Sequence, residues 1–134
     1  MPTTSGVFTV SDFVPTDYRS PVTTGVDVGH AHLVKHFTGA IEGTAYTQFS
    51  AAYAMATGVG TYVAMESFEG TVDGRRGSLN VAHTATTTGA DKTNELLVIV
   101  PTSGTGELAG ITGSGSIAID EDGVHRLHLN YEYD

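Results

Sequence analysis

The sequence predicts an all-β fold, a single eight-stranded antiparallel up-and-down barrel. Seventeen glycines against four prolines, with abundant threonine and valine, are typical of strands joined by tight turns. Apolar and polar residues alternate with a period of two through eight short segments. Closing such strands into a barrel removes exposed sheet edges. The length of 134 residues predicts one domain, residues 1–134.

Eight strands are expected in succession along the chain. Phe8 and Val10 alternate with polar neighbours and predict the first strand over residues 6–14. Residues 15–27 hold two prolines and a turn signal, so we interpret them as a loop. Alternation resumes in the second and third strands. The strands after the first are predicted over residues 29–38, 44–56, 61–70, 78–88, 93–101, 114–120 and 124–133.

The segments between strands carry turn signals. Asp73-Gly74 is a strong hairpin signal between the fourth and fifth strands. Gly89-Ala90-Asp91 predicts a turn between the fifth and sixth strands. Residues 105–110 predict at most one short helical turn, with no Lys-Ser or Lys-Thr pair of the kind a phosphate-binding loop requires. The connections are therefore mostly short, as an up-and-down barrel needs.

Composition excludes several classes of partner. The formal charge of −9 argues against binding to nucleic acid or to an anionic membrane surface. With no cysteines, the chain has neither disulfides nor thiolate metal sites. A targeting signal would need a basic segment followed by an apolar one, and the N-terminus lacks this pattern. The longest apolar run, residues 96–101, is too short to cross a bilayer. We therefore predict a cytoplasmic location.

A carboxylate and an imidazole stand in otherwise apolar rows of the two central strands. Glu66 shares its face with Tyr62 and Phe68, and folding the hairpin sets it roughly opposite His83. Burial raises the pKa of a carboxylate, and a neighbouring cation opposes that change. Such a group is suited to acid–base catalysis. We predict Glu66, His83 and Lys35 as catalytic residues.

Cross-strand pairing extends this group into a polar belt inside the barrel. It places Lys35 near Gln48 and Ser50 near Glu66. The predicted substrate-binding residues are Gln48, Ser50, Tyr62, Phe68, Leu97 and Tyr131. A buried ion-pair network that only sets strand register is the structural alternative. A shift of one residue in the third strand would turn Gln48 outward.

Three histidines on the second strand offer a rival site. His30, His32 and His36, between Gly25 and Gly43, loosely resemble the first metal motif of cupins. Neutral imidazoles at this spacing can bind divalent transition metals. However, the alternation that turns Lys35 inward turns these histidines outward. We interpret them as a solvated strand face.

Several short motifs lie between residues 33 and 134: KHFTG (35–39), EG (42–43), ESF (66–68), GSLNVAHT (77–84), VP (100–101), SGTGELAG (103–110) and LNYEYD (129–134). Through these motifs the segment resembles a bacterial family of unknown function, DUF3224. The family is similar in fold to allene oxide cyclase, a small eight-stranded barrel with an interior pocket. The resemblance thus implies an allene-oxide-cyclase-like, calycin-like barrel.

Three functions remain open at this point. The preferred one is a cofactor-free cyclase or isomerase acting on a small, largely apolar organic molecule inside the barrel. The alternatives are a non-catalytic barrel that binds a similar ligand and a cupin-like metal enzyme using the three histidines. Both faces of residues 96–100 are apolar, so we also expect a homodimer or trimer.

Overall fold

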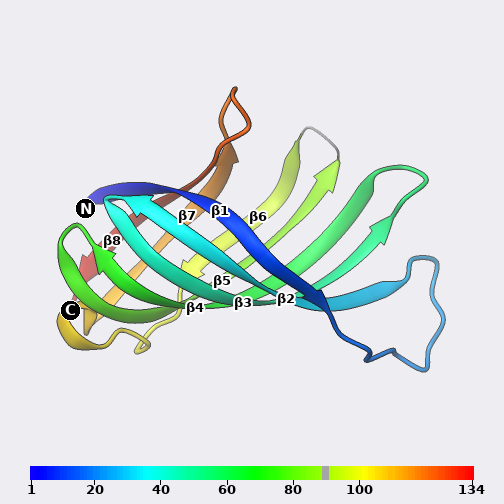
Figure 1. Cartoon of the computed structure of the whole chain (residues 1–134), viewed down its shortest axis with the longest axis horizontal. Coiled ribbons are helices and arrows are strands. Elements are labelled where there is room, and N and C mark those ends of the chain that lie inside the picture. The colour runs from blue at the N-terminus through cyan, green and yellow to red at the C-terminus, as the bar shows by residue number, and fades with distance from the viewer. Residues whose placement is uncertain (89–90) are drawn as a thin grey trace.

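Eight antiparallel strands form a closed barrel, in which each strand pairs with the next and β8 pairs with β1 (Figure 1). The computed structural model describes residues 1–88 and 91–134. The strands are β1 (Thr3–Pro15), β2 (Val28–Gly39), β3 (Ile41–Ala54), β4 (Val59–Val72), β5 (Arg75–Thr88), β6 (Lys92–Ile99), β7 (Ile111–Ile119) and β8 (His125–Tyr133). Within the described residues, the one helical segment is the 3₁₀ turn η1 (Gly106–Leu108). The predicted fold class is confirmed.

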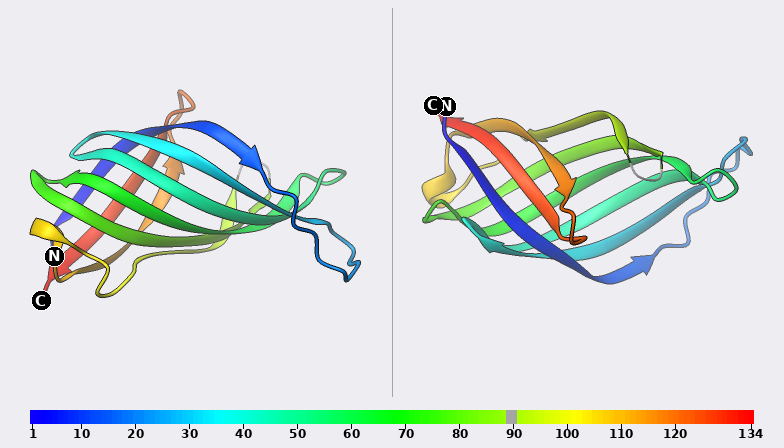
Figure 2. Two further views of the ribbon diagram at one scale, coloured as in Figure 1. Left: turned by 60° about the horizontal axis from the view of Figure 1, so that its bottom comes forward. Right: turned by 90° about the horizontal axis from the view of Figure 1, so that it is seen from above.

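The two ends of the barrel differ. The chain termini, the β2–β3 and β4–β5 hairpins and η1 lie together at what we call the plugged end (Figures 1 and 2). The β1–β2, β3–β4 and β7–β8 connections lie at the opposite, open end. Leu108 of η1 is fully buried and belongs to the hydrophobic core. η1 therefore packs its side chain into the core at the plugged end.

Inward-facing apolar side chains fill the half of the barrel next to the plugged end. Strand alternation turns every second residue inward, and these residues come from all eight strands. The most deeply buried aliphatic side chains are Ile41, Val72, Leu97, Ile99, Leu108 and Ile111. This half is therefore a packed core that supports the open half above it.

Two glycines allow β3 and β4 to approach closely near the plugged end. Gly43 pairs with Gly70, and a Cβ atom on Gly70 would lie 2.0 Å from the Glu42 carbonyl oxygen. A Cβ atom on Gly43 would lie 2.2 Å from the Glu69 carbonyl oxygen. No side chain fits at either position without moving the opposite strand.

The third strand begins earlier than the sequence predicts, and this reverses its faces. It starts at Ile41, immediately after a tight turn, so Lys35 pairs with Ala45. The predicted partner of Lys35 was Gln48, three residues further along. An offset of three is odd, so it exchanges the inward and outward faces. Gln48 and Ser50 therefore lie on the outer face of the sheet, contrary to the prediction.

The predicted pairing of the central hairpin is displaced by two residues. Glu66 pairs with Thr47 on one side and with Val81 on the other, whereas His83 pairs with Ala64. A displacement of two preserves the faces, so Glu66 and His83 both point inward. The turn predicted at Gly89-Ala90-Asp91 lies largely outside the described residues.

Apolar side chains also occupy the outer surface. Leu96 on β6 is 56% exposed, and Val63 and Met65 on β4 are also exposed. Their exposure shows that the described part of the chain leaves them uncovered. Self-association through this outer surface therefore stays a prediction. Among the described residues, no helix has the length and hydrophobicity needed to cross a membrane.

The close approach at Gly70 makes a testable prediction about stability. Replacing Gly70 with Ala forces the added methyl group against the Glu42 carbonyl, and we expect a loss of about 1–3 kcal/mol in the free energy of unfolding. Gly29→Ala is the matched control on β2, since no atom lies within 4 Å of a Cβ placed there. Thermal or urea unfolding measures both variants. Equal stability of the two would contradict this explanation.

Candidate functional site

A pocket of about 340 Å³ opens at the open end of the barrel. Its size lies at the lower end of the roughly 300–1,000 Å³ range of small-molecule sites. Its wall combines apolar side chains with several polar ones. The lining residues are Phe8, Val10, Leu33, Lys35, Thr47, Phe49, Tyr62, Ala64, His83, Thr87, Asp91, Lys92, Ile117, Ile119 and His125.

A buried ion pair separates this pocket from the packed half of the barrel. Lys35 Nζ lies 3.1 Å from Glu66 Oε2, and the two side chains are 10% and 5% exposed. Thr47 donates its hydroxyl to the other oxygen, Glu66 Oε1, at 3.1 Å. Below the pair lies an apolar cavity of only about 20 Å³, room for about one water molecule. Lys35 lines both spaces, so the ion pair is the floor of the pocket.

The charges in this pair are compensated within the barrel. A buried charge is costly unless it is paired and hydrogen-bonded. The carboxylate of Glu66 accepts one hydrogen bond on each oxygen, from Lys35 and from Thr47. The Lys35 ammonium also lies 4.7 Å above the ring centroid of Phe8, a favourable cation–π distance. An ammonium group has three N–H donors, so one bond to Glu66 does not exhaust it.

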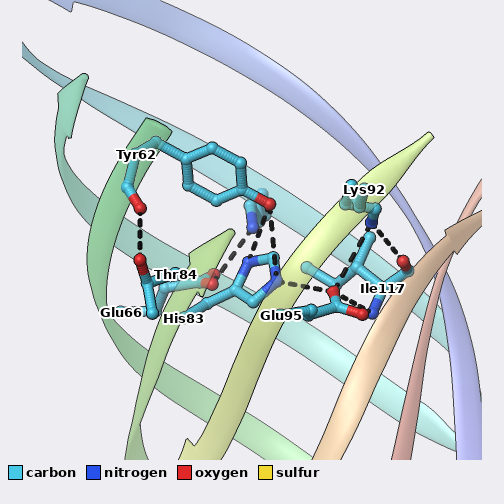
Figure 3. Close-up of polar contacts among 8 residues, drawn as sticks. Tyr62, Glu66, His83, Thr84, Lys92, Glu95 and Ile117 are labelled. Carbon is cyan, nitrogen blue, oxygen red and sulfur yellow. Dashed lines mark hydrogen bonds and ion pairs between the residues drawn. The ribbon is translucent and has the colours of Figure 1, made fainter. Parts of the chain in front are cut away.

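A second polar group, a histidine–carboxylate dyad, stands in the wall of the pocket (Figure 3). His83 Nε2 lies 2.8 Å from Glu95 Oε2. The same carboxylate oxygen accepts the backbone N–H of Ile117 at 3.1 Å and lies 3.5 Å from Lys92 Nζ. Lys92 also donates to the carbonyl of Ile117. Glu95 is thus held in place from β6 and β7, and it orients the imidazole on β5.

The charge state of the dyad follows from its surroundings. Burial lowers the pKa of His83, and the positive charge of Lys35 adds to this effect, although Glu95 opposes it. Burial alone would raise the pKa of Glu95, but the hydrogen bonds from His83 and Ile117 and the charge of Lys92 together lower it. At neutral pH the dyad is a neutral imidazole beside a carboxylate. Because a carboxylate only accepts, Nε2 carries the imidazole proton and Nδ1 has a free lone pair.

Tyr62 adds a hydrogen-bond donor beside the imidazole. Its hydroxyl oxygen lies 3.5 Å from Nδ1 and 3.4 Å from Nε2 of His83, and the two rings meet edge to face. Burial and the negative charges of Glu95 and Glu66 raise the pKa of Tyr62 to about 12. The phenol therefore keeps its proton at neutral pH.

The structure distributes the sequence-predicted site residues over several places. Lys35, Tyr62 and His83 line the pocket, with Glu66 in its floor. Phe68 lines the small apolar cavity below the floor, and Leu97 is buried in the core. Tyr131 lies at the plugged end, where it donates to Asp73. Gln48 and Ser50 lie outside the barrel, as described above.

The predicted contact between Glu66 and His83 is replaced by two separate pairs. Glu66 binds Lys35 and Thr47, whereas the carboxylate partner of His83 is Glu95. Sequence reasoning missed Glu95 and Thr47. Glu95 lies two residues before the buried Leu97 and therefore shares its inward face. This spacing could have identified Glu95 as an interior carboxylate, but the strand was interpreted only as apolar wall.

The three histidines of β2 lie on the outer face. His30 bonds to the Thr16 hydroxyl at 2.8 Å, and His36 bonds to the Ser11 hydroxyl at 3.0 Å. Over residues 1–88 and 91–134, no three histidine or carboxylate side chains converge into a group suited to a metal ion. The geometry does not favour the cupin-like alternative.

Comparisons with known proteins identify the relatives of this chain. The family described as "Protein of unknown function (DUF3224)" matches residues 4–131. A crystal structure of a DUF3224 protein of unknown function from Shewanella oneidensis MR-1 is similar over 100% of this chain and 98% of that one, with 30% identity and a TM-score of 0.88. No curated protein matches the chain. The family match and the structural similarity agree, and the chain belongs to the DUF3224 family.

Proposed function

We propose that the barrel is an acid–base enzyme of the isomerase or cyclase type, acting on a small, largely apolar organic molecule in the open-end pocket. The observation that carries this proposal is the neutral His83 imidazole, held 2.8 Å from Glu95 in the pocket wall. A base with a lowered pKa remains unprotonated near neutral pH and is ready to accept a proton. Its orientation by a carboxylate is the arrangement that hydrolases also use to position a catalytic histidine.

The proton transfer is best assigned to His83 rather than to Glu66. Both oxygens of Glu66 already accept hydrogen bonds, one of them from an ammonium group. Among the described residues, the hydrogen-bond partner of His83 Nδ1 is the Tyr62 hydroxyl, at a distance of 3.5 Å. A substrate carbon–hydrogen bond can approach this lone pair if the Tyr62 hydroxyl turns towards a substrate oxygen. Glu66 then pairs with Lys35, and Glu95 keeps the Nε2 proton in place.

The pocket also contains groups that could stabilise the negative charge formed on the substrate oxygen. Removal of a proton next to a carbonyl leaves an electron pair that moves onto the oxygen as an enolate. The Lys35 ammonium and the Tyr62 hydroxyl are donors that would stabilise that oxygen. Return of the proton from His83 to a different carbon completes an isomerisation with no other reactant. In a cyclase, the enolate carbon would attack a second carbonyl carbon of the same molecule, the carbon–oxygen π bond would break, and the new alkoxide would take the proton from His83.

Hydrogen–deuterium exchange tests this activity without knowledge of the natural substrate. α-Tetralone, a small neutral ketone, exchanges its α-hydrogens in D₂O when a base removes them, and proton NMR follows the loss of signal. We expect wild-type protein to accelerate this exchange above the buffer rate. His83→Asn should lower the protein-dependent rate by about 10²-fold or more. His36→Asn, which alters an outer-face histidine, is the matched control and should exchange like wild type.

Two outcomes would decide against the catalytic role. Binding of the ketone without acceleration by the wild-type protein would favour the non-catalytic barrel. Acceleration that persists in His83→Asn would place the base elsewhere in the molecule.

The charge state of His83 makes a second prediction. Burial lowers its pKa below the usual value of 6.5, so the folded protein binds fewer protons than the unfolded chain as pH falls below 6.5. The contribution of His83 to stability therefore falls as the pH drops from just above 6.5 through its lowered pKa, and His83 adds no pH dependence well above 6.5. An NMR titration should place its midpoint below 6.5, and Glu95→Gln should lower it further because Glu95 favours the imidazolium. His83→Asn assigns the resonance; a midpoint above 6.5 would refute the neutral dyad.

The floor of the pocket makes a third prediction. Glu66→Gln leaves the buried Lys35 without its counter-charge, and we expect a loss of about 3–5 kcal/mol in the free energy of unfolding. Glu69→Gln, which changes an exposed carboxylate on the same strand, is the control and should change stability by less than about 0.5 kcal/mol. Urea unfolding compares the two variants. A Glu66→Gln protein as stable as the control would show that the pair is not a structural requirement.

A further inference from the structure

The rings in the pocket form two walls on opposite sides of the barrel. Phe49 on β3 stacks on Tyr62 on β4, with centroids 5.6 Å apart and planes 29° apart. Tyr62 meets His83 on β5 edge to face at 5.2 Å. Across the barrel, Phe8 on β1 and His125 on β8 lie 5.5 Å apart. In a closed ring of eight strands, β8 and β1 are opposite β4 and β5, so the two aromatic walls face each other.

Every ammonium group that lines the pocket, among the described residues, has a carboxylate partner. Lys35 is paired with Glu66 at 3.1 Å, and Lys92 lies 3.5 Å from Glu95. Asp91 adds a further negative charge to the lining. The chain as a whole carries a formal charge of −9, which repels anions at longer range. A carboxylate or phosphate ligand would therefore enter a site with no uncompensated cation to receive it.

Lys35, Tyr62 and His83 are lining residues on three strands of one side of the barrel, β2, β4 and β5, and Thr47, Thr87, Asp91, Lys92 and His125 are the other lining residues with polar groups. To a ligand beside Lys35, Tyr62 and His83 these residues offer the remaining N–H groups of Lys35, the hydroxyl of Tyr62 and the acceptor Nδ1 of His83. Lys35 acts on His83 electrostatically, since its positive charge contributes to the lowered pKa of His83, and the Tyr62 hydroxyl lies 3.5 Å from His83 Nδ1. This grouping suits a ligand with one oxygen function and an otherwise apolar body.

We propose that the pocket takes a neutral, planar aromatic molecule bearing a single carbonyl or hydroxyl oxygen. The flat body lies between the Phe49–Tyr62 wall and the Phe8–His125 wall, where ring faces and edges make favourable contacts with another aromatic ring. The oxygen points to Lys35 and Tyr62, which places the adjacent carbon next to His83. This substrate class rests on the proposed function of the same site and specifies it further.

Two pairs of probe molecules test separately whether the ligand is planar and whether it is neutral. α-Tetralone and α-decalone share one bicyclic ketone skeleton, but only tetralone has a flat aromatic ring. 2-Naphthol and 2-naphthoate share the aromatic rings, but only naphthoate is an anion near neutral pH. Calorimetry or ligand-observed NMR gives each dissociation constant. We expect tetralone to bind at least tenfold more tightly than decalone, and naphthol at least tenfold more tightly than naphthoate.

Variants locate the binding in the pocket. Phe49→Leu should weaken tetralone binding at least fivefold and leave decalone binding unchanged, because it removes one ring of the wall. Tyr46→Leu, which alters an exposed aromatic residue on the outer face of the same strand, is the control and should bind both ketones like wild type. Circular dichroism and the melting temperature confirm that both variants are folded. Equal weakening in the two variants would refute the assigned location.

Probe binding tests the ligand class, whereas deuterium exchange tests the proposed enzymatic function, so each can fail without the other. If decalone binds as tightly as tetralone, the ligand need not be planar. If naphthoate binds as tightly as naphthol, the ligand need not be neutral. Either result would overturn this proposal even if His83-dependent exchange is observed. Absence of binding by all four probes would overturn the assigned ligand class as well. Selective binding of tetralone and naphthol without deuterium exchange would support the ligand class and reject the isomerase.

Discussion

The Lys35–Glu66 ion pair, 3.1 Å long and almost fully buried, is the constraint on which the interior depends. Two charges inside a barrel persist only if each is compensated, and Thr47 supplies the remaining hydrogen bond to Glu66. Because these residues come from adjacent strands, the pair requires the register in which Lys35 pairs with Ala45 and Glu66 with Thr47. It also sets the depth of the pocket, with apolar packing below it and accessible space above it.

The dyad depends on a second local feature, an irregularity in the pairing of β5 with β6. The register shifts between Thr84 and Thr86, and Asn94 adopts a positive φ of 54° beside Glu95. Such bulges redirect a side chain and occur near functional sites. Glu95 reaches His83 from this segment, while the Ile117 backbone amide on β7 holds the carboxylate. Three neighbouring strands therefore fix one imidazole in one orientation.

The asymmetry of the barrel explains why chemistry would be confined to one end. At the plugged end, η1 inserts Leu108 and the hairpins are short, so apolar side chains fill the space. At the open end, aromatic and polar side chains point inward and line the pocket. Each strand is hydrogen-bonded to both neighbours, but among the described residues β6 and β7 pair only through Val98–Ser114 and Ile99–Gly113. At the open end, contacts of Lys92 and Glu95 with the Ile117 backbone join these two strands and hold the dyad in place.

The sequence by itself determined the all-β class, the order of the eight strands, the 3₁₀ turn near residues 105–110 and the inward face of Lys35, Glu66 and His83. These features follow from alternation and turn chemistry, which are local. Only the tertiary structure decided which inward groups touch. The turn before Ile41 shifted β3 by three residues, replacing Gln48 and Ser50 with Thr47 and Phe49, and a bulge brought Glu95 to His83. Periodicity assigns a side chain to a face, whereas its partner depends on register and bulges that involve several strands at once.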